Sequence, residues 1–187
     1  MTIVGLAIVV VQLWREVDPL RTEVRQLREQ VGVLTINDPS VVHVIGVPSD
    51  AEGVMKWRIY VPANKTAILR ARCGDVTRTA YPESEFQHKL GSGEQLLTIT
   101  AKRRENEGTS FTADIQAPQG NSMITMAFTE DDLTGVFETH RVSSSTEVMD
   151  KNDKLVLVRS RFAPPGKSQL LGKDVPLPGY IIWLEQQ

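Results

Sequence analysis

The sequence predicts a mainly β protein, in which an N-terminal membrane-anchor helix and a short amphipathic or coiled-coil helix precede an antiparallel β-sandwich or barrel. Three features of the chain of 187 residues favour this class. It begins with an uncharged apolar stretch, continues into heptads of Val and Leu, and then changes to an alternation of period two. We therefore divide it into an anchor (1–16), a stalk (17–36) and a β-domain (40–187).

The first segment is typical of a membrane anchor. Residues 2–14 carry no charge, and Trp14 is followed at once by Arg15, as at the edge of a bilayer. As a helix this stretch would be about 20 Å long, whereas a full span needs about 20 residues. A cleaved signal peptide would start with a positive residue and end at small residues, and neither is present. We expect a single-pass anchor in membrane lipid whose span begins a few residues upstream; the alternative is a buried core helix.

The side of the membrane on which the β-domain lies stays open. Four arginines follow the anchor and none precedes it, so the positive-inside rule favours a cytoplasmic domain. Residues upstream of the start would change that count.

Residues 17–34 follow a heptad pattern with Val at position a and Leu at position d, which favours a parallel two-stranded coiled coil. In such a dimer the acidic g positions face the basic e positions of the partner helix, with opposite signs in both heptads. The sequence therefore predicts a parallel homodimer. The candidate dimer contacts are Glu16, Leu20, Arg21, Glu23, Val24, Leu27, Arg28, Val31 and Leu34.

Two residues limit this helix. Pro19 removes a backbone hydrogen bond, so we expect the helix to restart at Asp18-Pro19, with Asp18 as the N-cap. Gly32 weakens the far end. What remains is two clean heptads, and an amphipathic helix packed on its own β-domain is the alternative to self-association.

Beyond the breaker residues 37–40, apolar and polar residues alternate as in half-buried strands. Met55, Trp57, Ile59 and Val61 form one such series. The other predicted runs are Ala67–Cys73, 111–117, 41–47, 95–102, 122–128, 154–162 and 180–185. Turn residues separate these eight or so strands, and only 129–134 is a helix candidate, which favours a sandwich or barrel. Residues 143–146 and 163–178 are expected to be long loops.

Composition excludes several classes of function. The net charge of -2 gives no general attraction to nucleic acid. The single cysteine, Cys73, excludes intrachain disulfides and multi-thiolate zinc sites, and its alternation predicts a buried, inert thiol. The histidines His43, His88 and His140 lack a metal-binding spacing. We expect no cofactor.

Other motifs that resemble sites are better explained as structure. Gly166-Lys167-Ser168 resembles the end of a phosphate-binding loop, but the earlier Gly is missing and no helical pattern follows. Glu83 and Glu85 would lie about 7 Å apart on an extended chain, within the range of glycosidase carboxylates, although they belong to a Pro-containing loop. We therefore expect no catalytic residues.

Tyr60 is the best surface candidate for a ligand contact among the aromatic residues. It alternates with the apolar series of its strand and lies beside Lys56 and Arg58, whereas Trp57 is expected in the core. Cross-strand packing is the simpler explanation for Tyr60.

The chain also resembles a family of small membrane-anchored proteins of planctomycete bacteria to which no activity is assigned. The shared residues are spread over most of the chain and are sparse between 89 and 154. They are 13–17, Pro19-Leu20-Arg21, Glu23-Val24-Arg25, Leu27-Arg28, Gly32, Asp38-Pro39, His43, Lys56-Trp57-Arg58, Tyr81-Pro82-Glu83 and 179–185. The resemblance implies the layout of anchor, short helix and β-domain, and implies nothing about chemistry.

Together these features lead us to expect a non-enzymatic, membrane-tethered β-domain that binds or scaffolds a protein or glycan partner at the membrane surface. Two alternatives remain: an envelope carbohydrate-binding or hydrolytic protein that uses Glu83, Glu85 or His140, and a structural component of an envelope assembly.

Overall fold

A computed structural model describes residues 15, 19, 32–104, 108–117, 120–127, 136–142, 145–149 and 154–187. Arg15 and Pro19 are helical and exposed. The rest of the expected anchor, the heptads up to Val31 and the helix candidate 129–134 lie outside this part of the chain. Within the described residues, no helix has the length and apolar character needed to cross a bilayer.

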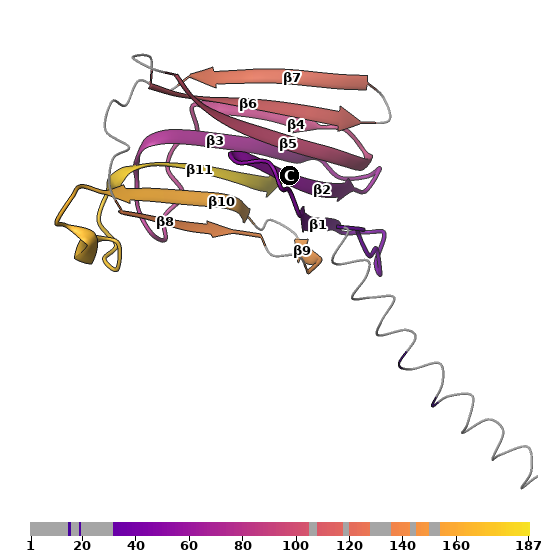
Figure 1. Ribbon diagram of the computed structural model, residues 1–187. Helices are drawn as coiled ribbons and strands as arrows, with labels where there is room; N and C mark the ends of the chain where they lie inside the picture. The colour runs from indigo at the N-terminus through magenta and orange to yellow at the C-terminus, as the bar shows by residue number, and fades with distance from the viewer. Residues whose placement is uncertain are drawn as a thin grey trace, which may run out of the picture.

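The described residues form two antiparallel sheets that pack face to face, so the fold is a β-sandwich (Figure 1). One sheet has the order β7-β6-β5-β2-β1-β9, and the second has the order β4-β3-β11-β10-β8. The strands are β1 (Val42–Val47), β2 (Val54–Val61), β3 (Ala67–Val76), β4 (Phe86–Leu90), β5 (Gly93–Arg104), β6 (Gly108–Ala117), β7 (Gly120–Ala127), β8 (Val136–Arg141), β9 (Glu147–Met149), β10 (Lys154–Ala163) and β11 (Leu177–Gln186). A short 3₁₀ helix, η1 (Ser168–Leu170), lies between β10 and β11.

The core lies between the two sheets and contains the apolar residues that the alternation assigns to it. Trp57, Ile59 and Val61 of β2 are buried against Leu69 and Ala71 of β3 and further residues of both sheets. Burial of each large side chain contributes about 1.5–3 kcal/mol. The prediction of inward and outward faces for these strands is confirmed.

The alternation fails within β10, for a local reason. The pairing of β10 with β11 shifts between Val156 and Val158, as at a β-bulge. The extra residue leaves both Leu157 and Val158 fully buried, although they are adjacent in sequence.

Three strands, β4, β8 and β9, are missing from the sequence-based prediction. All three are edge strands of their sheets, and β9 has three residues. An edge strand packs fewer side chains against the core, so its sequence loses the regular apolar alternation. The expected loop 163–178 is also too long at its end, because β11 begins at Leu177.

The expected stalk, 17–36, is wrong at its C-terminal end. Residues 33–36 are not helical, and Gly32 has φ +67, a value typical of the residue that ends a helix. Leu34, predicted as a dimer contact at position d, lies in this irregular segment and is 9% exposed. A dimer contact by Leu34 stays a prediction, as for the other heptad residues.

A second, smaller apolar cluster covers the outer face of the β11 sheet. Val76, Ile181 and Trp183 are buried there, and the ring of Tyr81 lies 5.9 Å from that of Trp183. The Tyr81 hydroxyl donates to the carbonyl of Lys154 at 3.1 Å. The segment that follows β3 is thus held against this sheet by its aromatic side chain.

Candidate functional site

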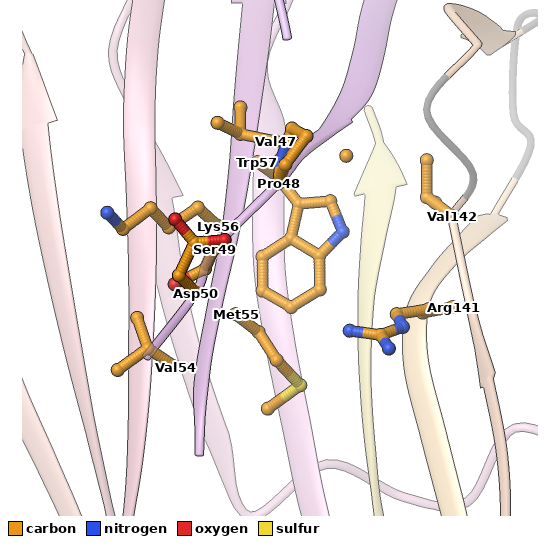
Figure 2. A pocket seen from close by; sticks show the side chains of 11 residues that line it. Val47, Pro48, Ser49, Asp50, Val54, Met55, Lys56, Trp57, Arg141 and Val142 are labelled. Carbon is orange, nitrogen blue, oxygen red and sulfur yellow. The ribbon is translucent and has the colours of Figure 1, made fainter. Parts of the chain in front are cut away.

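A groove of about 380 Å³ opens where the two sheets separate beside β1 and β8, and we call it the Trp57 groove (Figure 2). Its volume falls within the range of small-ligand and peptide sites. The lining residues are Gly46, Val47, Pro48, Ser49, Asp50, Val54, Met55, Lys56, Trp57, Arg141 and Val142.

Three chain segments position this groove. The end of β1 and the turn after it supply residues 46–50, the start of β2 supplies residues 54–57, and the end of β8 supplies Arg141 and Val142. Figure 2 shows Arg141 across from Met55 and Trp57, with Asp50 and Lys56 to the left of these two residues, on the side away from Arg141. Because β8 and β1 belong to different sheets, the groove exists only after the sandwich has formed.

The groove combines an apolar floor with a charged rim. Met55 is half-buried, and Trp57 is 1% exposed, so the indole supports the floor and offers no free face to a ligand. Lys56 and Arg141 are positive and Asp50 is negative. Such a surface holds a partner through buried apolar contact and ion pairs at the rim.

The structure gives Tyr60, the predicted surface ligand contact, a packing role. It is half-buried, its hydroxyl donates to the Pro39 carbonyl at 3.2 Å, and its ring lies 6.1 Å from that of His43. His43 is 1% exposed, with Nε2 at 2.6 Å from the Asp38 carbonyl. The side chains of Tyr60 and His43 therefore both hold the turn that precedes β1 against the sheet. A ligand contact by Tyr60 stays a prediction.

Asp38 organises the same turn. Its carboxylate accepts a hydrogen bond from the Ser40 backbone amide at 2.8 Å. Hydrogen bonds from the Ser40 side chain and backbone hold the pKa of Asp38 below its ordinary value. The Asp-Pro-Ser sequence, recognised as a breaker, thus has a specific local geometry.

The residues of the hydrolase alternative are spread over one sheet. Glu83 and Glu85 are exposed, and Glu85 pairs with Arg72 at 3.0 Å beside β4. His140 lies on β8, at the opposite edge of the same sheet. Three strands separate these edges, and strands lie about 4.8 Å apart.

The remaining sequence candidates occupy structural positions. Cys73 is buried, as the alternation predicts, and Tyr180 is its cross-strand neighbour. Gly166-Lys167-Ser168 leads into η1, which begins at Ser168 and is a single 3₁₀ turn rather than the helix of a phosphate-binding loop. No group of three or more His, Cys, Asp or Glu side chains that would hold a metal occurs within the described residues.

Sequence reasoning missed the groove because its walls come from segments that are distant in the chain. Arg141 follows Phe137-Glu138-Thr139-His140, a stretch without a clear apolar period. Asp50 lies in a turn. The one available signal was Met55 beside Lys56 at the start of β2, which was interpreted only as core alternation.

Comparison of the chain with family models, with curated proteins and with solved structures gives no match.

Proposed function

We propose that this chain is a non-enzymatic, membrane-tethered β-sandwich that binds a protein partner at the membrane surface through the Trp57 groove. One observation carries the proposal: the groove opens where the chain comes in from its N-terminal segment. Val47 lines the groove, and the same side chain lies against Gly32, which belongs to the segment before the β-domain. A tether through residues 1–31 would therefore hold the groove close to the bilayer.

The chemistry of the groove favours a protein segment over a glycan. Sugar sites present the open face of an aromatic ring, whereas the Trp57 ring is covered. Met and Arg, together with aromatic residues, are enriched at protein interfaces. A partner segment would fit this groove if it packed an apolar side chain against Met55 and placed an acidic residue in an ion pair with Arg141.

Fractionation tests the tether. We expect the full-length chain to stay with membranes during a carbonate wash and to enter solution only with detergent. Release without detergent would contradict the tether. It would not test partner binding in the groove, which needs a separate experiment. A C-terminal reporter fusion would then establish on which side of the membrane the β-domain lies.

Site-directed photocrosslinking tests the groove. A photoreactive residue at Ser49, in the groove, should give a partner adduct that disappears in the Arg141→Glu variant. The matched control places the same residue at Ser168, which is exposed in η1. Equal adducts from both positions, or an adduct from Ser49 that survives Arg141→Glu, would contradict groove binding.

A further inference from the structure

A second cavity, of about 160 Å³, lies on the other face of β8, and we call it the arginine pocket. Its lining consists of Arg78, Glu138, His140, Arg159 and Arg161. Glu138 pairs across the strands with Arg161, and His140 pairs with Arg159, so β8 and β10 hold four of these side chains on one face. Arg78 reaches the pocket from the segment after β3.

Arg161 places an almost fully buried charge in this pocket, since the residue is 1% exposed. Its guanidinium donates to the carbonyls of Val76, Leu171, Lys173 and Val175 at 2.9–3.3 Å. These acceptors are neutral. Among the residues that the structure describes, the carboxylate that meets Arg161 directly is that of Glu138, at 3.5 Å and partly exposed.

Arg159 adds a second guanidinium whose acceptors are also carbonyls. It donates to the carbonyls of Arg78, Thr79 and Ala80. Its Nε is buried and has no hydrogen-bond partner among the described residues. Burial lowers the pKa of Arg159, and the nearby charge of Arg161 lowers it further.

Among the described residues, the carboxylates of Glu138 and Asp174 face the three guanidinium groups of this pocket. Glu138 lies 3.9 Å from Arg78 and is shared with Arg161. Asp174 faces the arginines from the loop after β10. Its carboxylate already accepts the backbone amides of Arg78 and Thr79 and the hydroxyl of Thr79.

We infer that the arginine pocket binds a phosphate group. The cavity has the volume of roughly five water molecules, at about 30 Å³ each, which suits a compact oxyanion and is smaller than a typical organic-ligand site. Phosphate oxygens accept hydrogen bonds from guanidinium N–H groups. The donors for phosphate come from Arg78, whose side chain is 54% exposed, and from the Nε of Arg159, whereas Arg161 uses its N–H groups on carbonyls and Glu138 and contributes its charge. Three guanidinium groups against the carboxylates of Glu138 and Asp174 leave an excess of positive charge among the described residues, which a bound oxyanion offsets. This site lies apart from the Trp57 groove and does not depend on the function proposed for it.

Thermal unfolding of the full-length protein in mild detergent tests the inference. Inorganic phosphate and glycerol 3-phosphate are titrated separately, at constant ionic strength, with chloride as the reference. Both should raise Tm in proportion to the logarithm of concentration, because a ligand that binds only the native state stabilises it. A stronger response to glycerol 3-phosphate would identify an esterified phosphate, as in a lipid headgroup, and a stronger response to inorganic phosphate would identify the free ion. No response to either would overturn the inference.

Arg78 provides the informative variant because its side chain is 54% exposed, in contrast to the buried Arg161. Arg78→Gln should weaken phosphate binding about tenfold or more. Arg78→Lys should weaken it less, because lysine keeps the positive charge and loses only the planar set of N–H donors of the guanidinium. The matched control is Arg58→Gln, an exposed arginine that pairs with Glu94 on the other sheet. An equal phosphate response in Arg78→Gln and in the control would overturn the site.

Discussion

Gly32 lies directly against Val47. A Cβ built at Gly32 would come within 2.8 Å of Cγ2 and 3.0 Å of Cα of Val47. Gly32 therefore lies at the end of β1, next to the Trp57 groove. This contact connects the two regions that the sequence predicts as separate units.

Replacement of Gly32 by Ala should destabilise the protein by about 1–3 kcal/mol, because it adds a Cβ to a residue with positive φ and presses it on Val47. Urea unfolding of the full-length chain measures the change. Gly166→Ala is the matched control: Gly166 has φ +77, and a Cβ there meets nothing within 4 Å. The control keeps the backbone strain and lacks the contact, so equal losses in the two variants would mean that the Val47 contact contributes nothing.

Arg161→Met should cost about 3 kcal/mol or more, because four carbonyls lose a charged donor and those that remain buried stay unpaired. Residues 171–175 should also exchange their amide hydrogens faster. Arg161→Lys should recover only part of the loss, since an ammonium does not reach acceptors on four sides. Lys167→Met, at an exposed position of the same loop, serves as the control in the unfolding measurements. A wild-type exchange pattern in Arg161→Met would refute the anchoring role.

Asp174 should make stability depend on pH in the acid range. The Thr79 hydroxyl foremost, and the backbone amides of Arg78 and Thr79, lower the pKa of Asp174 below its value in the unfolded chain. A lowered native pKa stabilises the fold above the unfolded pKa, and the contribution disappears as pH falls through the native pKa. We therefore expect Tm to fall less steeply below about pH 4 in Thr79→Val than in wild type, whereas Thr79→Ser keeps the wild-type slope. Identical slopes in all three proteins would exclude this hydrogen bond as the cause.

Cys73 should react slowly with a thiol reagent such as Ellman's reagent while the protein is folded, and completely in concentrated urea. Its side chain is buried on β3, beside Tyr180 of the neighbouring strand β11, and a buried thiol in apolar surroundings is inert. A cysteine placed at exposed Ser168, in a Cys73→Ser background, gives the rate of an accessible thiol. Similar rates for the two cysteines in the native state would show that this part of the core opens readily.

The predicted stalk dimer should respond to charge reversal. Glu23→Lys places like charges opposite Arg28 of the partner helix in a parallel coil, so self-association of the full-length chain in detergent should weaken. Adding Arg28→Glu restores opposite signs and should restore association, which analytical ultracentrifugation can measure. A chain that stays monomeric in all three forms would favour the alternative of a helix packed on its own β-domain.

The positions of most strands along the chain, their inward faces and the burial of Trp57, Leu69 and Cys73 follow from the sequence alone. A period-two alternation of apolar and polar residues indicates which face of a strand is buried. The tertiary structure decided what that pattern does not encode. Strands β4, β8 and β9 pair with their neighbours at sheet edges, and Gly32 lies against Val47. The Trp57 groove and the arginine pocket likewise join Arg141 to Met55 and Arg78 to Arg161, residues brought together only by packing and strand register. A local sequence pattern reports burial, whereas the position of one segment relative to another depends on contacts between residues far apart in the chain.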